Sequence, residues 1–434
     1  MDKLRLIYFI LIIILCIPST AFAYLDPGTG NILVYIVISL AGALIFSIKG
    51  LFYALIGKKG ITSKSDKNGN FDHIVLFNEG KNYWSTFKPI VDALIKLKQP
   101  FSYYTMDIED PGLTIEYENE YMNKRYIGTG NIAYAKMGKL DAYVVLSTTP
   151  NIGTDGFPLP RSPKIKHLSH VFHAVSDLCF YHKGSLDHYD SVMLVGEFEI
   201  PIIRKLESLR GLPEKHLYPA GLPYLDVLAS KVPKNLATNG RTILIAPSWG
   251  TKGCLKLYGH KFIQDLAQAG YNIIVRPHPQ SWKVETEMLS KIRSVMSKYQ
   301  NVIWDVDPDG TQSLAKSDIM ISDTSSVRFD YIFLYKKPVI TLESPMPDPE
   351  DFEMADLKES ILEKIISEVG VTLNHETIDN IVAVVRGILD KNSLAYDLDE
   401  FRDKTIYNFG YSGEVIAEYL VSKSHELQEA KEVA

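Results

Sequence analysis

The sequence predicts an α/β protein with two domains, each a parallel sheet covered by helices, preceded by an N-terminal transmembrane helix or hairpin. Three observations support this. At 434 residues the chain exceeds one ordinary domain. From residue 73 onward, short apolar runs alternate with amphipathic helical stretches. Two long apolar runs fall within residues 1–59. Hydrophobic residues make up 46% and charged residues 23%, a composition typical of a globular protein.

The N-terminal part predicts membrane attachment. Residues 1–23 show a signal-peptide pattern, with Lys3 and Arg5 before an apolar stretch that ends in Ala-x-Ala. Residues 24–59 begin with the turn YLDPGTGN and continue into an apolar run long enough to span a bilayer. Either the first run is cleaved or both remain as a hairpin. In both cases the flanking lysines and arginine lie inside, so the following domains are expected at the cytoplasmic face of the cell membrane. A secreted soluble protein is the alternative.

Residues 60–235 are predicted to form the first α/β domain. Helical stretches at 87–97 and 200–209 separate strand-like apolar runs. The predicted strands are 73–77, 101–106, 142–148 and 191–196. A polar stretch at 230–241 then predicts a linker.

Residues 236–400 are predicted to form the second α/β domain, and residues 401–434 the C-terminal helices. Amphipathic helices are expected at 260–270, where Gly270 ends the pattern, and at 285–299. The predicted strands are 242–249, 272–279, 301–307, 319–321 and 338–342. Since ligands bind beyond the carboxyl ends of such strands, the cleft between the two domains is the expected site.

Several strand ends of the second domain carry polar residues. Arg276 and His278 stand in the stiff sequence RPHP, and a planar guanidinium suits phosphate oxygens. Ser248 follows the strand at 242–249. After residues 319–321 comes the knot Ser322-Asp323-Thr324-Ser325-Ser326, with Asp330 about one turn into a helix. By itself the knot is typical of a helix cap; beside an arginine it favours a phosphate at the start of a helix, with Asp330 accepting from ribose hydroxyls.

A histidine cluster is the notable feature of the first domain. His167, His170 and His173 lie on a segment that looks like a strand leading into a loop. Their spacing does not match a zinc motif. Each could be structural, but the near-neutral pKa of imidazole makes one of them a possible general base.

Other features exclude classes of function. With a net charge of −6, the chain lacks the overall positive potential that attracts nucleic acid. Three scattered cysteines form neither a zinc motif nor a disulfide framework. The acidic sequence DVDPDG at 305–310 favours a turn over a metal site. We therefore predict no metal and no cofactor.

Paired motifs resemble one family. RPHP at 276–279 and SDTSSVRFDYIFLYKKPVI at 322–340 resemble the C-terminal signature of the CDP-glycerol glycerophosphotransferases, which build teichoic-acid-type polymers. Supporting motifs are ILIAPSW, GLPYLDVL and YNFGYSGEVIAEYL, so the resemblance covers roughly residues 160–420. It implies the two-domain GT-B fold, with the nucleotide held by the second domain.

The resemblance also implies roles. Arg276 and His278 would contact the donor phosphates. Residues Ser322, Asp323, Ser325 and Ser326 would line the phosphate site, and Asp330 the ribose site. The family's base is a histidine usually followed by glycine; His173 is the best match but precedes Ala174, which leaves His170 as a rival. The implied reaction moves glycerol phosphate, or a similar alditol phosphate, from CDP-glycerol to a hydroxyl of a lipid-linked or polymeric acceptor and releases CMP.

Two alternatives belong to other classes. A GT-B glycosyltransferase or epimerase that uses a UDP-sugar would have a similar phosphate helix, and donor preference would separate it. A membrane-anchored nucleotide- or polymer-binding protein without catalysis would bind donor but release no product. The departure at Ala174 keeps this last alternative open.

Overall fold

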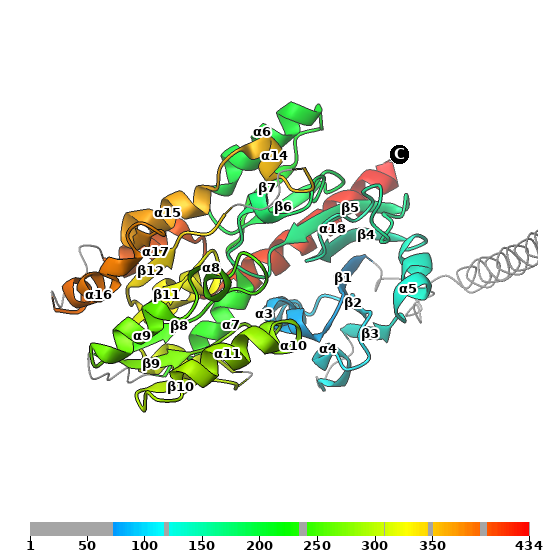
Figure 1. Cartoon of the computed structure of the whole chain (residues 1–434). Coiled ribbons are helices and arrows are strands. Elements are labelled where there is room, and N and C mark those ends of the chain that lie inside the picture. The colour runs from blue at the N-terminus through cyan, green and yellow to red at the C-terminus, as the bar shows by residue number, and fades with distance from the viewer. Residues whose placement is uncertain are drawn as a thin grey trace, which may run out of the picture. The chain divides into compact units, whose positions relative to one another are not determined.

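The computed structural model of the chain describes residues 73–116, 121–233, 241–307, 309–345, 350–390 and 397–433 (Figure 1). The predicted signal peptide, transmembrane segment and most of the predicted linker lie outside these residues. Among the described residues, no helix combines the length and the apolar character needed to cross a membrane.

The first sheet contains seven parallel strands in the order β3-β2-β1-β4-β5-β6-β7. Chain order runs outward from β1 in one direction and then from β4 in the other, which is the doubly wound topology. The strands are β1 Ile74–Asn78, β2 Phe101–Thr105, β3 Met122–Tyr126, β4 Ala142–Ser147, β5 Ile165–Val171, β6 Ser191–Leu194 and β7 His216–Pro219. The helical segments are η3 Lys81–Tyr83, α3 Trp84–Lys96, α4 Pro111–Thr114, α5 Gly130–Met137, η4 Leu178–Phe180, α6 Glu199–Arg210 and α7 Pro223–Lys231.

The second sheet repeats this topology with six parallel strands in the order β10-β9-β8-β11-β12-β13. Its strands are β8 Thr242–Ile245, β9 Asn272–Val275, β10 Val302–Trp304, β11 Ile319–Ser322, β12 Val339–Leu342 and β13 Val371–Leu373. Its helical segments are α8 Cys254–Tyr258, α9 Lys261–Gln268, α10 Ser281–Val284, α11 Thr286–Met296, α12 Thr311–Lys316, α13 Val327–Asp330, η5 Tyr331–Tyr335, α14 Met354–Leu357, α15 Ile361–Val369, η6 Ile378–Asn380 and α16 Ile381–Asp390. The α/β class with two parallel, doubly wound sheets is therefore confirmed.

The strands missed by the sequence patterns are edge strands. β3, β7 and β13 each lie at the edge of a sheet. β3 has the polar sequence MNKRY and β13 has only three residues, so neither carries the buried apolar run of a central strand. The last strand predicted from the sequence is 338–342, and β13 corrects this by adding a strand after it.

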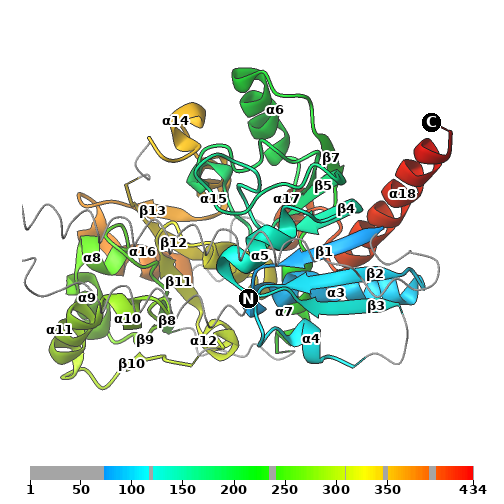
Figure 2. The same cartoon turned by 90° about the vertical axis from the view of Figure 1, so that its right-hand side faces the viewer.

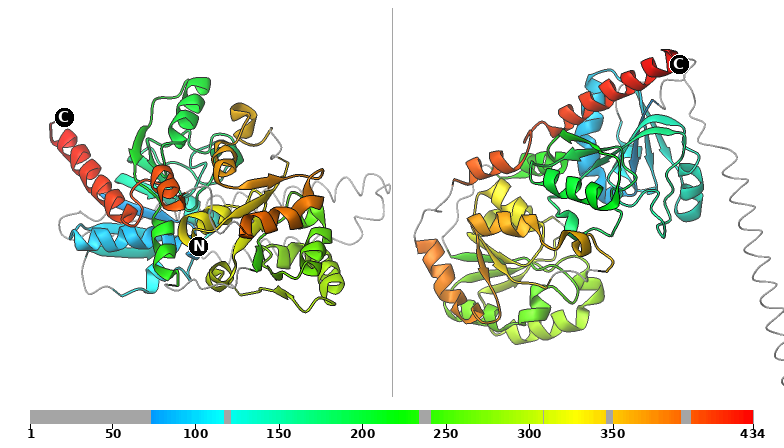
Figure 3. Two further views of the ribbon diagram at one scale, coloured as in Figure 1. Left: turned by 90° about the vertical axis from the view of Figure 1, so that its left-hand side faces the viewer. Right: turned by 90° about the horizontal axis from the view of Figure 1, so that it is seen from above.

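The C-terminal helices return to the first domain. After α17 Leu398–Thr405, the long helix α18 Ser412–Val433 runs back along the first sheet, as the red helix in Figures 2 and 3 shows. Ile416, Ala417 and Leu420 of α18 are fully buried in one core cluster with residues of α3 and β1. The chain end therefore covers one face of the N-terminal sheet.

Two motifs that supported the family resemblance meet at this crossing. Asp226 of GLPYLDVL accepts hydrogen bonds from the backbone nitrogens of Gly410 (2.7 Å) and Ser412 (2.9 Å) of YNFGYSGE. Gly221 has a φ of +89°, and a Cβ there would lie 2.2 Å from the carbonyl oxygen of Tyr407. The two motifs therefore build one crossing of the chain, which a larger residue at 221 would disrupt.

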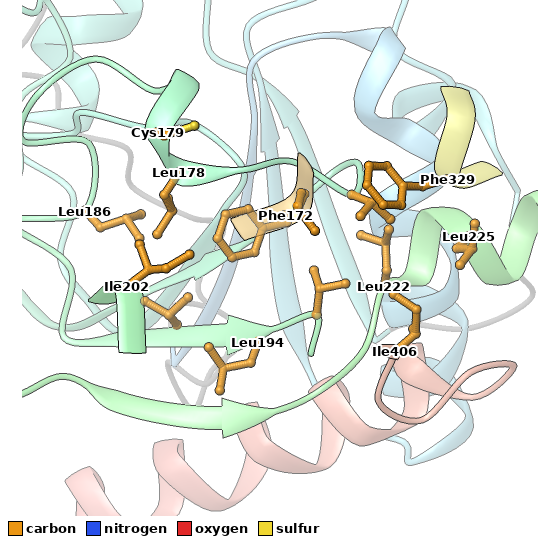
Figure 4. Close-up of a cluster of buried hydrophobic side chains, with 14 of the residues drawn as sticks. Phe172, Leu178, Cys179, Leu186, Leu194, Ile202, Leu222, Leu225, Phe329 and Ile406 are labelled. Atoms are coloured by element: carbon orange, nitrogen blue, oxygen red, sulfur yellow. The ribbon is translucent and has the colours of Figure 1, made fainter. Parts of the chain in front are cut away.

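Apolar packing continues from the first sheet to the helices of the second domain. Figure 4 shows part of this core, in which Phe329 of α13 lies near Leu222 at the start of α7. A second cluster, with Ile263 of α9 and Val385 of α16, fills the outer side of the second sheet. The described residues of the two domains belong to one compact unit.

Candidate functional site

The two sheets contribute their switch-point loops to one cavity. The loop after β4 supplies Asn151 and the loop after β5 supplies His173, while the loop after β11 supplies Thr324 and Ser326. This cavity, called the His173 cavity below, has a volume of about 450 Å³. Since β4 and β11 lie where the strand order reverses in their sheets, the cavity lies where ligands of doubly wound folds bind.

His173 is held in the wall of this cavity. The Tyr83 ring packs edge-to-face on the imidazole, with ring centroids 4.7 Å apart. Burial lowers the pKa of His173 to about 4, so the ring is neutral at pH 7 and can accept a proton. Its Nδ1 is buried and has no hydrogen-bond partner among the described residues. The imidazole is therefore positioned by packing, and no carboxylate of the described residues orients it.

His170 has a different environment. Its ring is fully buried between Phe172 and Tyr189, at centroid distances of 4.8 and 5.0 Å. Neither ring nitrogen has a partner among the described residues, and burial lowers the pKa of His170 to about 3. His170 does not line the His173 cavity. The geometry therefore favours His173 over its rival as the base.

His167 belongs to another network. Its Nε2 lies 2.9 Å from Ser191 Oγ and 3.0 Å from the Tyr419 hydroxyl on α18. His167 therefore joins the C-terminal helix to the amino ends of β5 and β6. These lie at the end of the sheet opposite to the cavity.

Residues 322–326, the serine loop, divide into two parts. Ser322 and Asp323 are fully buried. Ser322 donates to the carbonyl oxygen of Ala246 at 2.5 Å, and Asp323 accepts from the backbone nitrogens of Ser248 (3.0 Å) and Cys254 (2.7 Å). In this structure these two buried side chains fix the loop to the neighbouring backbone. Ser248 contributes its backbone nitrogen, not its hydroxyl, to these contacts.

The other part of the serine loop is open. Thr324 and Ser325 are partly exposed and Ser326 is exposed. Ser326 lies at the start of α13, but its side chain makes no capping hydrogen bond, contrary to the simple cap expected from the sequence. α13 continues directly into the π-helical turn η5, a form often found at functional sites. The hydroxyls of this part are therefore available to a ligand.

A second cavity lies on the other side of α13, which contributes Val327 and Asp330 to it. This Asp330 cavity, of about 500 Å³, is lined by Tyr224 and Lys231 of α7 and by Arg276, Asp309 and Asp330 of the second domain. The Asp330 carboxylate is buried, and burial raises its pKa to about 7. The Tyr224 hydroxyl donates a long hydrogen bond of 3.4 Å to it.

A smaller cavity of about 130 Å³ connects Arg276 and His278 with Ser325. Nη1 of Arg276 lies 2.6 Å from the Asp305 carboxylate and 2.7 Å from the Asp307 carbonyl oxygen. Nδ1 of His278 accepts from the backbone nitrogen of Gln280, and burial lowers the pKa of His278. Arg276 is therefore preoriented at the carboxyl end of β9, beside the open part of the serine loop.

Asp305 also explains the acidic sequence at 305–310. Its carboxylate pairs with Arg276 and accepts from the Ser313 hydroxyl. The described residues hold no cluster of three or more His, Cys, Asp or Glu side chains arranged for a metal ion.

Sequence reasoning missed an ion pair beneath the serine loop. Arg328 is buried, and its guanidinium forms a two-pronged pair with Glu363 of α15. Its Nε donates to the carbonyl oxygen of Ser325 at 3.0 Å. The pairing joins residues 35 positions apart, which no local pattern reveals, although an arginine inside a buried segment was a usable signal.

Two doubly wound sheets with cavities at their switch-point loops form a fold that resembles GT-B. Residues 183–354 match the model of the CDP-Glycerol:Poly(glycerophosphate) glycerophosphotransferase family. The match confirms the resemblance carried by the RPHP and SDTSS motifs, which both lie within the matched residues. No curated protein sequence matches the chain.

Solved structures support the fold. The wall teichoic acid polymerase TagF has a TM-score of 0.50 and 16% identity, over 90% of this chain and 97% of that one. A putative UDP-N-acetylglucosamine 2-epimerase from Listeria monocytogenes has a TM-score of 0.55 and 13% identity, over 82% and 97%. The UDP-GlcNAc 2-epimerase from Methanocaldococcus jannaschii has a TM-score of 0.51 and 15% identity, over 80% and 99%. At these identities the likeness shows the fold alone.

Proposed function

We propose that the chain transfers glycerol phosphate, or a similar alditol phosphate, from a CDP-alditol to a hydroxyl of a lipid-linked or polymeric acceptor and releases CMP. One observation carries the proposal. The serine loop and α13 after it lie between a cavity that contains a neutral, partly buried histidine and the cavities that contain Arg276 and Asp330. Such an arrangement suits a donor that crosses the loop with its phosphates and meets a base on the far side.

In this proposal the nucleoside occupies the side of Arg276 and Asp330. The Asp330 carboxylate accepts from a ribose hydroxyl, and Arg276 with His278 faces the diphosphate beside Ser325. A charged, preoriented donor of hydrogen bonds stabilises the charge that develops on the phosphate oxygens during transfer. Asp305 holds Arg276 in place before the donor arrives.

The reaction then takes place at the His173 cavity. His173 accepts the proton of the acceptor hydroxyl as its oxygen forms a bond to the phosphorus that carries the alditol. The bond from this phosphorus to the oxygen of CMP breaks, and CMP leaves with the electron pair. Burial keeps His173 neutral in the empty protein, and a bound diphosphate would raise its pKa toward the working pH, which improves its strength as a base.

The location is a separate part of the proposal. Residues 1–59 would anchor the catalytic domains at the cytoplasmic face of the cell membrane, near a lipid-linked acceptor. Deleting residues 1–59 should move the protein from the membrane pellet to the supernatant. A truncated protein that still sediments with membranes would contradict the anchoring role of this segment.

The donor is tested by thermal stabilisation of the full-length chain in detergent. The ligands are CDP-glycerol, CDP-ribitol, CMP, UDP-glucose and UDP-GlcNAc. A ligand present at about 100 times its Kd should add roughly 2.7 kcal/mol to the free energy of unfolding. A shift with cytidine ligands that disappears in Arg276→Ala supports the proposal. A shift with the uridine sugars alone would assign the chain to the UDP-sugar glycosyltransferases or epimerases instead.

A further inference from the structure

The loop that carries His173 also carries a carboxylate that the proposed reaction does not use. Residues 172–177, the His173 loop, connect β5 to η4. Asp177 ends this loop, is 3% exposed and lines the His173 cavity. Its Oδ1 accepts a hydrogen bond from the backbone nitrogen of Cys179 at 3.0 Å and so caps η4. One carboxylate oxygen therefore fixes the end of the loop itself.

The other oxygen of Asp177 binds the second domain. Oδ2 accepts from Ser360 Oγ at 2.7 Å and from the backbone nitrogen of Leu362 at 3.0 Å. Both partners stand at the start of α15, where Ser360 also accepts from the backbone nitrogen of Glu363. The first backbone nitrogens of a helix have no partner within it and favour a negative charge nearby. Asp177 thus supplies a carboxylate to the start of a helix that belongs to the other domain.

The same helix start reaches the serine loop. Glu363, in the first turn of α15, pairs with the buried guanidinium of Arg328. Nε of Arg328 donates to the carbonyl oxygen of Ser325 at 3.0 Å. A continuous series of hydrogen bonds and one ion pair therefore runs from the His173 loop through α15 to the serine loop. Because Ser360 and Arg328 are buried, water competes little for these contacts.

Other contacts at this domain boundary end away from both loops. Asp356 of α14 lies 2.8 Å from Nη2 of Arg210 on α6. Lys205 of α6 donates to the carbonyl oxygen of Leu357 at 2.9 Å. These contacts join one domain to the other, whereas the contacts of Asp177 join one functional loop to the other.

We propose that Asp177 is a positioning residue, which holds His173 in place relative to the serine loop across the domain boundary. In the proposed reaction His173 must meet the acceptor hydroxyl beside a phosphorus that is held at the serine loop. A displacement of about 1 Å in such a geometry can cost about 10²-fold in rate. The expected effect on rate rests on the proposed function, whereas the link between the loops does not.

Two variants break this link from opposite sides. In Asp177→Asn, an amide oxygen in the place of Oδ1 still accepts from Cys179, but an amide nitrogen in the place of Oδ2 opposes the N–H of Leu362. The variant therefore keeps the cap of η4 and loses the bond to α15. Ser360→Ala is the milder variant, because it removes only the hydroxyl on the side of the second domain. Asp356→Asn is the control, since it breaks a contact at the same boundary that ends at neither loop.

Amide hydrogen exchange of the full-length chain in detergent tests the link without any substrate. Asp177→Asn and Ser360→Ala should each raise the exchange rate about tenfold in both the His173 loop and the serine loop. Asp356→Asn should leave both loops as they are in the wild type. Unchanged exchange of the serine loop in Asp177→Asn and Ser360→Ala would overturn the inference, because a residue that shapes only its own loop has no effect in the other domain. An equal rise in Asp356→Asn would also overturn it.

Kinetics test the effect on rate, with the folded fraction counted by the stoichiometry of CMP binding. Asp177→Asn should lower kcat at least tenfold, with KM for CDP-glycerol and the affinity for CMP nearly unchanged. When it is combined with His173→Asn, no further loss should follow, because no base is left to position. Losses that multiply in the double variant would overturn the positioning role. A wild-type chain without transferase activity would refute the proposed function instead, and hydrogen exchange would then decide the inference.

Discussion

The two sides of the serine loop differ in how they hold their functional groups. On the side of Asp330, polar and charged groups line the cavity: Arg276 pairs with Asp305, and Asp330 accepts a hydrogen bond from Tyr224. On the side of His173, the base is neutral and packed against Tyr83. One side presents a charged guanidinium, and the other presents a neutral base.

The two sides would suit two different substrates, a diphosphate and a hydroxyl. A diphosphate requires fixed positive charge and hydrogen-bond donors, which the second domain supplies at the carboxyl ends of its strands. An attacking hydroxyl requires a base that is unprotonated, which desolvation on the first domain secures. If the two sides act independently, a change on one side should leave the role of the other intact.

The largest effect should come from the base. His173→Asn removes the proton acceptor, and turnover should fall on the order of 10²- to 10⁴-fold, the usual contribution of general base catalysis. Thermal stabilisation by CDP-glycerol should persist, because the donor binds on the other side of the loop. Turnover is measured by release of CMP.

His170→Leu is the matched control for that variant. Both imidazole nitrogens of His170 are buried without partners among the described residues, so an apolar side chain removes unsatisfied polar atoms. Activity should stay near normal and the melting temperature should hold or rise. Loss of turnover in His170→Leu together with normal turnover in His173→Asn would make His170 the base.

The next effect tests the charged side. Arg276→Ala should lower turnover on the order of 10²- to 10³-fold and abolish the thermal shift with CMP, because it removes a charge-assisted donor to the phosphates. Asp305→Asn is the control, since it leaves the guanidinium in place but loosens its orientation. We expect it to weaken CMP binding less than Arg276→Ala. An unchanged CMP shift in Arg276→Ala would remove Arg276 from the donor site.

A third effect concerns the loop that separates the two sides. Arg328→Met leaves Glu363 without its partner and should cost about 3 kcal/mol of unfolding free energy in denaturant titrations. The double variant Arg328→Met/Glu363→Leu removes both charges and should recover most of that stability. Its turnover should remain low, because the Ser325 carbonyl oxygen has lost the hydrogen bond that fixes the loop. Full activity of the double variant would show that the loop does not need this anchor.

Sequence patterns predicted the central strands of both sheets, because buried parallel strands have continuous apolar runs. They also predicted candidate site residues at the strand ends, because ligands bind at the carboxyl ends of such strands. They missed β3, β7 and β13, whose edge positions require no such run. They also did not separate Ser322 and Asp323, which point into the domain, from Ser325 and Ser326. Which side of a loop is buried depends on long-range contacts, such as that of Asp323 with Cys254, 69 positions away.

The smallest effect is a pH dependence that should appear on one side only. Burial raises the pKa of Asp330 to about 7 in the folded protein, well above its usual value. Its contribution to stability is therefore fully present below about pH 4 and is lost as the pH rises through 7. If the ionised carboxylate accepts from the ribose, CMP affinity should fall as the pH drops below 7, by up to about tenfold per pH unit.

Titration calorimetry with CMP at pH 6, 7 and 8 measures this dependence. Asp330→Asn should bind CMP more weakly and with a smaller change of affinity over this range, which leaves only the titration of the CMP phosphate, whose second pKa is about 6. Asp309→Asn is the control: Asp309 lines the same cavity, but hydrogen bonds from Thr311 lower its pKa, so it stays ionised throughout this range. His173 should not contribute either, because its lowered pKa keeps it neutral above pH 6. If Asp330→Asn kept the wild-type slope, the titrating group would lie elsewhere and the ribose contact would be lost from the proposal.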